Sequence, residues 1–247
     1  MRLRLDASTH LLVLTGAGVS AESGIPTFRA GGGLWENHPI ERVASPQGFR
    51  EDPELVWRFY SDRRRQARDV QPNPGHLAVA AIEERLGDRF LLVTQNIDGL
   101  HRRAGSHRMV EIHGSLFETR CAHCDRPSFA DDKVYYGADV PACDACERKG
   151  RKGLLRPNIV WFGEMLDPDH MRRIEVFMES SARARFVFLA IGTSGVVYPA
   201  AGLVLHARAA GAETWLVNAD PPENRSAFQH FVQGPSGKVL PELVEWA

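Results

Sequence analysis

Two closely spaced pairs of cysteines are the residues whose types and spacing point most directly to chemistry. Two residues separate Cys121 from Cys124 and Cys143 from Cys146, and eighteen residues lie between the pairs. Pairs with this spacing bring four thiolates around one tetrahedral Zn²⁺ ion. Because four cysteine ligands leave no open position for water, we expect one zinc ion with a structural role.

Three other roles for these cysteines stay open from the sequence: a catalytic metal, a redox pair, or a zinc ribbon that binds nucleic acid. The segment around them mixes both signs of charge, which favours a solvated face over a nucleic-acid surface. Its charged residues include Arg148, Lys149, Arg151 and Lys152, together with Asp131, Asp132, Asp139 and Asp144.

A second candidate site is the glycine-rich segment at residues 16–26, which follows a short apolar run. Its glycines have the pattern G-x-G-x₅-G, which departs from the G-x-G-x-x-G fingerprint of dinucleotide-binding folds. Glycine still lets the backbone approach a pyrophosphate, and a helix after the loop would offer its first N–H groups. The alternative is a tight strand-to-helix turn without a ligand. Small side chains leave room for a ligand at Ala17, Ser20, Ala21 and Ser23.

Four apolar runs predict the strands that must position these residues. They lie at residues 11–14, 90–94, 186–191 and 214–217. Runs that are apolar throughout are typical of parallel strands covered by helices on both faces. Ligands of such sheets bind at the carboxyl ends of the strands. Three of these ends are polar or glycine-rich, at Thr15-Gly16, Thr94-Gln95-Asn96 and Gly192-Thr193-Ser194.

Helix starts alternate with these strands. A capping residue precedes a proline at Asp52, Asn73 and Asp167, and Tyr198-Pro199 opens a further helix to about Ala210. The alternation predicts an α/β fold with a doubly wound, Rossmann-like parallel sheet. Residues 117–157 break the pattern and predict an inserted module. We therefore expect a large domain at 1–35, 73–116 and 158–247, and a small helical and zinc-binding domain at 36–72 and 117–157.

Composition excludes several classes of protein. The 247 residues carry a net charge of −1, without the basic excess of a dedicated nucleic-acid binder. The longest apolar runs have six residues, whereas a membrane span needs about 20. The first residues lack the apolar stretch of a signal peptide, so we expect a cytoplasmic protein. We also expect no membrane partner, no sequence-specific nucleic acid and no obligate partner.

Several of these motifs, taken in order, resemble the sirtuins, which are NAD-dependent protein-lysine deacylases. The resemblance rests on residues 16–29, 94–98 and 192–194, on His113-Gly114 and on the four cysteines. It runs from about residue 10 to the C-terminus and implies NAD as co-substrate and acyl-lysine proteins or peptides as substrates. Two alternatives remain: a mono-ADP-ribosyltransferase that uses the same NAD site, and a non-catalytic NAD-sensing or zinc-ribbon binding module.

The resemblance implies which residues contact NAD. The first loop would close over the nicotinamide ribose, the polar segment after the second predicted strand would hold nicotinamide, and later strand ends would hold phosphate, ribose and adenine. The implied contacts are Gly16, Ala17, Gly18, Ser20, Ala21, Phe28, Arg29, Trp35, Gln95, Asn96, Ile97, Asp98, Gly192, Thr193, Ser194, Asn218, Ala219, Asp220 and Ser236.

His113 is the implied catalytic residue. It lies in Glu111-Ile-His-Gly-Ser115, which resembles the sirtuin histidine motif. In the implied chemistry, the acyl oxygen attacks the nicotinamide ribose and nicotinamide leaves. His113 then removes a proton from a ribose hydroxyl, a task that suits a near-neutral imidazole. Water finally releases lysine and O-acyl-ADP-ribose, and zinc takes no part.

Tyr60 and Arg63 carry a prediction about the acyl group. They are three residues apart on a predicted helix, so they project from one face. A guanidinium and a phenol together suit a carboxylate. In sirtuins this pair marks the branch that removes succinyl, malonyl and glutaryl groups, and Ala44 falls where that branch keeps a small residue. The alternative is a packed Tyr60 and a solvated Arg63; acetyl removal also stays open.

The substrate peptide is expected between the two domains. By resemblance, its backbone pairs as a strand with residues 158–164 and with the loop near residues 195–198. The implied contacts there are Val160, Phe162 and Gly163. The alternative is that residues 159–162 form an ordinary core strand.

Overall fold

The computed structural model describes residues 1–26, 34–35, 38–138, 140–195 and 197–247. Its main sheet has six parallel strands in the order β12–β11–β10–β2–β5–β6, which is the Rossmann order and confirms the predicted fold class. All four predicted strands are confirmed, and two short outer strands, β6 and β12, were not predicted. The strands are β2 (Thr9–Thr15), β5 (Phe90–Thr94), β6 (Met109–Glu111), β10 (Arg185–Ile191), β11 (Glu213–Asn218) and β12 (His230–Gln233).

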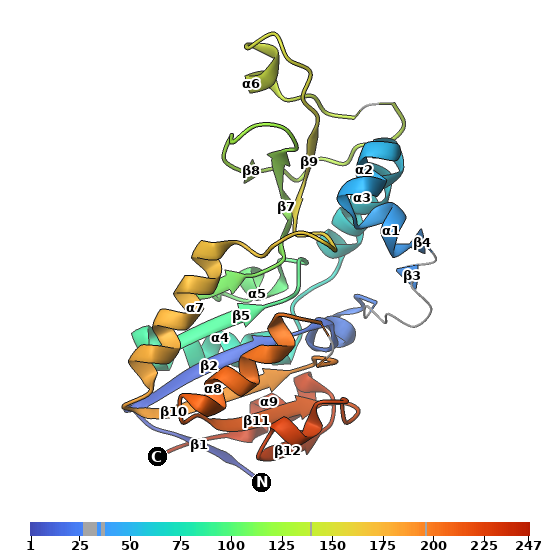
Figure 1. The fold of residues 1–247 in the computed structure, drawn as a ribbon. Helices are drawn as coiled ribbons and strands as arrows, with labels where there is room; N and C mark the ends of the chain where they lie inside the picture. The colour runs from blue at the N-terminus through green and yellow to red at the C-terminus, as the bar shows by residue number, and fades with distance from the viewer. Residues whose placement is uncertain (27–33, 36–37, 139, 196) are drawn as a thin grey trace.

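Helices cover both faces of this sheet (Figure 1). Successive residues of β2 point to opposite faces, so each face receives its own apolar core. Leu11 packs with helices α4 (Pro74–Leu86) and α9 (Ser236–Leu243), whereas Leu12 packs with α7 (Pro168–Ser181) and α8 (Leu203–Ala209). Burial on both sides explains why β2 is apolar without alternation.

The predicted helix starts are confirmed by their caps. The side chains of Asp52, Asn73 and Asp167 accept hydrogen bonds at 2.8–2.9 Å from backbone N–H groups two or three residues later. These caps satisfy N–H groups that a helix start leaves without partners. The helix predicted after Tyr198-Pro199 instead begins as a 3₁₀ turn (Ala200–Gly202) and continues as α8.

A second group of elements lies together at one end of the molecule, with α6 (Asp144–Glu147) farthest from the main sheet (Figure 1). A three-stranded antiparallel sheet of β7, β8 and β9 shares one apolar core with the helices α1, α2 and α3. Their bounds are β7 (Gly114–Cys121), β8 (Phe129–Ala130), β9 (Leu155–Ile159), α1 (Ile40–Val43), α2 (Pro46–Glu51) and α3 (Pro53–Asp69). The division into two domains at the predicted boundaries stays a prediction.

The remaining elements are short. β1 (Leu3–Leu5) pairs in parallel with β13 (Val244–Trp246), and β3 (Leu34–Trp35) pairs with β4 (His38–Pro39). Helix α5 (Leu100–Arg103) follows β5, and 3₁₀ helices span Ala17–Ser23, Gly87–Arg89 and Arg225–Ala227. None of the described helices is long and apolar enough to cross a membrane.

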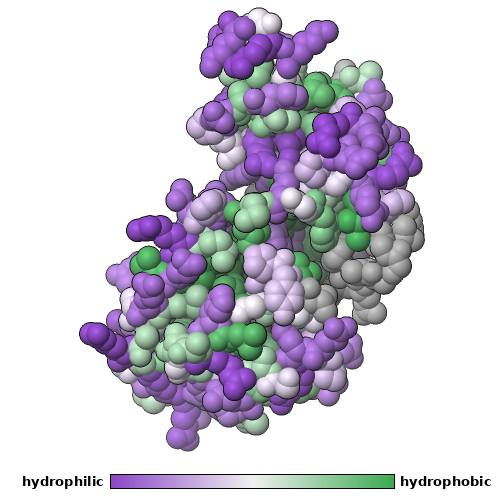
Figure 2. Space-filling model, viewed as in Figure 1, coloured by the Kyte–Doolittle hydropathy of each residue, from purple (hydrophilic) through white to green (hydrophobic). Residues whose placement is uncertain are grey.

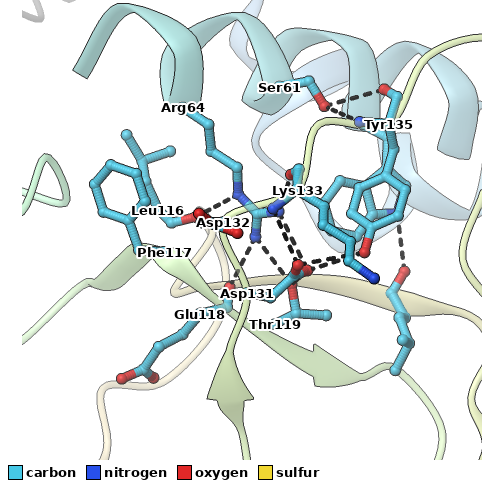
Figure 3. A network of polar contacts seen from close by, with 12 residues as sticks. Ser61, Arg64, Leu116, Phe117, Glu118, Thr119, Asp131, Asp132, Lys133 and Tyr135 are labelled. Carbon is cyan, nitrogen blue, oxygen red and sulfur yellow. Dashed lines mark hydrogen bonds and ion pairs between the residues drawn. The ribbon is translucent and has the colours of Figure 1, made fainter. Parts of the chain in front are cut away.

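Arg64 fixes helix α3 to the antiparallel sheet (Figure 3). Its side chain is fully buried and pairs with Asp131 at 3.2 Å. The guanidinium also donates to Thr119 Oγ1 and to the carbonyl oxygens of Leu116, Glu118 and Lys133. Such dense pairing offsets the cost of removing a charge from water. The network thereby sets the position of α3, which carries Tyr60 and Arg63.

Arg64→Met is expected to destabilise the protein by about 3–5 kcal/mol, because it leaves the buried Asp131 carboxylate without its cation. Urea unfolding monitored by circular dichroism measures the loss. Arg65→Met is the matched control, because the Arg65 side chain is exposed, and its effect should stay within about 0.5 kcal/mol. Equal stability of Arg64→Met and wild type would contradict the proposed role of the network.

Candidate active site

One large cleft lies at the carboxyl ends of the parallel strands and reaches α3 and the segment after β9. Its volume is about 1260 Å³. Most residues predicted to contact NAD, peptide or acyl group line it, although they come from separate parts of the chain. Those that line it are Gly16, Ala17, Gly18, Ala21, Trp35, Ala44, Tyr60, Arg63, Gln95, Asn96, Ile97, Asp98, His113, Val160, Phe162, Gly163, Gly192, Thr193, Ser194, Asn218, Ala219, Asp220 and Ser236.

Three predicted contacts stand apart from this set. Phe28 and Arg29 lie outside the described residues. Ser20 is fully buried and lies behind the cleft wall. The contact between Ser20 and NAD that the resemblance implied stays a prediction.

The glycines of the first loop serve close packing between two loops. Gly18 N donates to Gly192 O at 2.8 Å, and a Cβ on Gly18 would lie 2.7 Å from Gly192 Cα. Gly192 itself has φ +61°. These loops follow β2 and β10, the two strands between which the sheet order reverses. The glycines thus let the two loops meet at the point where ligands of such sheets bind.

Polar side chains join three of the strand ends. Gln95 Nε2, after β5, donates to Thr193 Oγ1, after β10, at 3.2 Å. Asn218 Nδ2, at the end of β11, donates to Thr193 O at 3.2 Å. These hydrogen bonds link three of the strand ends that form the floor of the cleft.

A buried network explains the position of Ser20. Its hydroxyl donates to Asp98 Oδ2 at 2.7 Å, so Ser20 Oγ accepts from Asn96 Nδ2 at 3.1 Å and from His76 Nε2 at 3.3 Å. His76 Nδ1 in turn accepts from Asn73 N. These bonds require a neutral imidazole, and burial lowers the pKa of His76 to about 4. Ser20 and His76 thereby orient Asn96 and Asp98 in the cleft wall.

His113 lies between β6 and β7 and faces the cleft. Its Nδ1 lies 3.1 Å from Gln95 O, and a carbonyl oxygen can only accept, so Nδ1 carries the proton. In the neutral ring, Nε2 is then the basic nitrogen. Burial lowers the pKa of His113, which keeps the ring neutral at pH 7. The adjacent Gly114 has φ +82° and lets β7 approach β9, where a Cβ would lie 1.9 Å from Asn158 O.

Tyr60 and Arg63 both border the cleft from α3, near Ala44. Arg63 Nη1 donates to Phe59 O at 3.0 Å, and the guanidinium carbon lies 4.1 Å from the centre of the Phe59 ring. Tyr60 is completely buried, and its hydroxyl accepts from Trp161 Nε1 at 3.0 Å. Burial raises the pKa of the Tyr60 phenol, so it remains protonated and able to donate. The expectation that this pair shares one helix face is confirmed.

The segment predicted to pair with a peptide is not a continuous strand. β9 ends at Ile159, and a turn follows at Phe162 and Gly163. Val160 N donates to His113 O and Phe162 N donates to Ala44 O, both at 3.0 Å. The Phe162 side chain is about half exposed, at 51%. Peptide pairing here stays a prediction.

The four cysteines converge as predicted, and their sulfur atoms lie within 4.8 Å of one another. Cys121 and Cys146 sulfurs are 3.7 Å apart, and those of Cys124 and Cys143 are 3.8 Å apart. Four sulfurs about 2.3 Å from one Zn²⁺ lie about 3.8 Å apart in a tetrahedron, so the cluster fits zinc. These separations are too long for disulfides. The surrounding end of the molecule is mostly hydrophilic (Figure 2).

Cys146→Ser is expected to remove most of the bound zinc and to lower the melting temperature. Structural zinc sites supply about 10–16 kcal/mol of apparent binding free energy, so the elements around the cysteines depend on the metal. Metal analysis by mass spectrometry and thermal melting measure both effects. His123→Ala is the matched control, because His123 lies between two ligands but is exposed. Full zinc content in Cys146→Ser would contradict the four-cysteine site.

The sequence alone did not identify two candidate functional residues, because only contacts with distant parts of the chain distinguish them. Trp161 borders the cleft and bonds the Tyr60 hydroxyl, yet in the sequence it is one of several apolar residues after β9. His76 is one of ten histidines, and its buried contacts with Ser20 Oγ and Asn73 N distinguish it. The sequence predicted Asn73 as a helix cap, but not that Asn73 and His76 together support the cleft wall.

Comparisons with known proteins agree with this geometry. The family model described as the Sir2 family matches residues 16–199. A curated Escherichia coli protein named NAD-dependent protein deacylase is 48% identical over 96% of this chain and 81% of its own length. NAD-dependent protein deacylase 2 of Pyrobaculum aerophilum is 46% identical over 98% of this chain and 92% of its own length.

Solved structures of Sir2 homologues are also similar to this chain. A Sir2 homologue in complex with NAD has a TM-score of 0.83 and 43% identity, covering 94% of this chain and 87% of that one. A Sir2 complex with a p53 peptide and NAD⁺ has a TM-score of 0.77 and 32% identity, covering 94% of this chain and 90% of that one. With a family model over most of its length and relatives at this identity, the chain belongs to the Sir2 family, the sirtuins.

Proposed function

We propose that this chain is an NAD-dependent protein-lysine deacylase that prefers acyl groups ending in a carboxylate, such as succinyl, malonyl and glutaryl, over acetyl. The observation that carries the proposal is that Tyr60 and Arg63 border the same cleft as His113. A histidine base and a cationic clamp therefore face one cavity. The names of the curated relatives support the deacylase part of the proposal.

The acyl preference follows from the cost of burying a charge. A terminal carboxylate that enters a cleft loses water and needs a cation and hydrogen-bond donors in return. Arg63 supplies the cation, and the protonated Tyr60 phenol supplies a further donor. An acetyl group carries no charge, so it gains little from either side chain. The small Ala44 side chain borders the cleft nearby and leaves room for a longer acyl chain.

The residues of the strand ends fit NAD as the co-substrate. The contact between the loops after β2 and β10 brings glycine backbone and the amides of Gln95 and Asn96 to one end of the cleft. When bound there, NAD would supply the ribose that receives the acyl group. His113 Nε2 would take a proton from a hydroxyl of that ribose, because Nδ1–H is held by Gln95 O.

The test compares acetyl-, succinyl-, malonyl- and glutaryl-lysine versions of one peptide with purified protein and NAD. We expect nicotinamide and O-acyl-ADP-ribose from each reacting peptide, with higher kcat/KM for the acidic acyl groups. Mass spectrometry of the products separates the alternatives. ADP-ribosylated protein would instead indicate a mono-ADP-ribosyltransferase, and no turnover of any peptide would indicate a binding module.

A further inference from the structure

The Tyr60 hydroxyl has one strong contact that the proposed function does not use. Trp161 Nε1 lies 3.0 Å from Tyr60 Oη. An indole N–H has no lone pair available and can only donate, so the phenol oxygen is the acceptor. The direction of this hydrogen bond is therefore fixed by chemistry.

This direction decides what the phenol offers to the cleft. A tyrosine hydroxyl has one proton, and its oxygen already accepts from Trp161. Within the part of the chain that the structure describes, no hydrogen bond uses that proton, and Tyr60 borders the cleft. The hydroxyl proton is thereby directed away from Trp161 and is available to donate, which suits a carboxylate.

Trp161 is itself held firmly. Only 2% of its surface is exposed, and the Arg156 guanidinium carbon lies 3.3 Å from the centre of its ring. Glu164 binds Arg156 with both carboxylate oxygens, at 2.6 and 3.0 Å, and also accepts from Trp161 N at 2.8 Å. The indole is fixed from its backbone and from one ring face, so its N–H has little freedom to leave Tyr60.

We propose that Trp161 is a positioning residue for acyl selectivity: its indole N–H holds Tyr60 Oη as an acceptor and so turns the phenol proton toward the terminal carboxylate of the acyl group. The inference rests on the proposed preference for acidic acyl groups and adds a residue that acts through Tyr60. Without the indole N–H, the Tyr60 O–H bond can take either of its two orientations in the ring plane and donates to the carboxylate less often.

The sharpest test replaces Trp161 by 3-benzothienylalanine, which keeps the ring shape but has sulfur in place of the N–H. Trp161→Phe is the simpler second variant. We expect KM for a succinyl-lysine peptide to rise about tenfold, the loss typical of one weakened hydrogen bond to a charged group. The KM for the acetyl-lysine peptide and both kcat values should change by less than about twofold, because the reacting atoms are untouched.

Trp57→Phe is the matched control. Trp57 is also buried, on α3 beside Tyr60, and its Nε1 donates to Leu155 O at 3.0 Å. The control therefore removes a buried indole hydrogen bond in the same core without touching the Tyr60 hydroxyl. Its ratio of succinyl to acetyl kcat/KM should match wild type, and melting curves of all variants report any general loss of stability.

A double-mutant cycle with Tyr60→Phe tests whether Trp161 changes acyl selectivity through the Tyr60 hydroxyl. In the Tyr60→Phe background, loss of the indole N–H should not change the succinyl-to-acetyl ratio further. An unchanged ratio in the single Trp161 variants, or a further change in the Tyr60→Phe background, would overturn the inference. If wild type itself lacks the acidic preference, the proposed function fails; if Arg63→Met is selective but the Trp161 variants are not, only this inference fails.

Discussion

His113→Ala is expected to lower kcat for deacylation by about 10²- to 10⁴-fold, the usual contribution of a positioned general base. KM for NAD and for the acyl peptide should change little, because the base acts on the proton of a reacting hydroxyl and not on substrate binding. His113 Nε2 is the basic nitrogen since Nδ1 donates to Gln95 O. Steady-state kinetics that follow nicotinamide and deacylated peptide separately measure the effect.

The dependence of kcat/KM on pH independently tests the role of His113 as a base. Burial lowers the pKa of His113 from its ordinary value of 6.5. Since the neutral ring is the active form, kcat/KM should stay level as pH falls from 8 to 6.5, and decline only at more acid pH. His206→Ala is the matched control, because His206 is an exposed histidine outside the cleft. Unchanged deacylation by His113→Ala would contradict the assigned role.

Arg63→Met is expected to raise KM for a succinyl-lysine peptide roughly 10- to 150-fold, which corresponds to about 1.5–3 kcal/mol for a hydrogen bond to a charged group. The acetyl-lysine peptide should lose far less, because acetyl has no carboxylate to pair. Methionine keeps most of the length of the side chain and removes the cation together with its hydrogen bond to Phe59 O. Parallel kinetics with the two peptides measure the difference.

The neighbouring arginine provides the control for this prediction. Arg65 is in the same basic run, but its side chain is exposed, pairs with Asp62 at 3.5 Å and does not border the cleft. Arg65→Met should leave the kinetics of both peptides unchanged. If Arg63→Met weakened both peptides equally, the carboxylate clamp would be wrong and Arg63 would serve general substrate binding.

Local signals in the sequence were sufficient for much of the fold. β2, β5, β10 and β11 are apolar throughout because both faces of the main sheet are covered, and this pattern is visible in one dimension. Helix caps are also predictable from the sequence, because each capping side chain bonds to a backbone N–H two or three residues later. This holds for Asp52, Asn73 and Asp167. β6 and β12 were missed because they are short and lie at the two edges of the sheet, where residues such as His230 and Gln233 weaken the apolar pattern.

Local sequence patterns also predicted part of the candidate site. The cysteine spacing predicted a cluster that the structure confirms, since each pair is linked by only two residues and is brought together locally. The apolar runs predicted Gln95 and Gly192 at strand ends, and these ends meet because parallel strands bring their carboxyl ends to one edge. His113 was identified by its motif alone, and the structure places it after β6, beside the same cleft. Their roles toward NAD and acyl-lysine stay predictions that the kinetics above test.

The sequence by itself determined the α/β class, the cysteine cluster and the residue types available at the strand ends, because these depend on periodicity and short spacing. Only the tertiary structure decided which way those side chains face. Ser20 donates to Asp98 across 78 residues of chain, and Trp161 donates to Tyr60 from about a hundred residues away. Hydrogen-bond direction depends on which partners packing brings within about 3 Å, and long-range packing leaves no local pattern in the sequence.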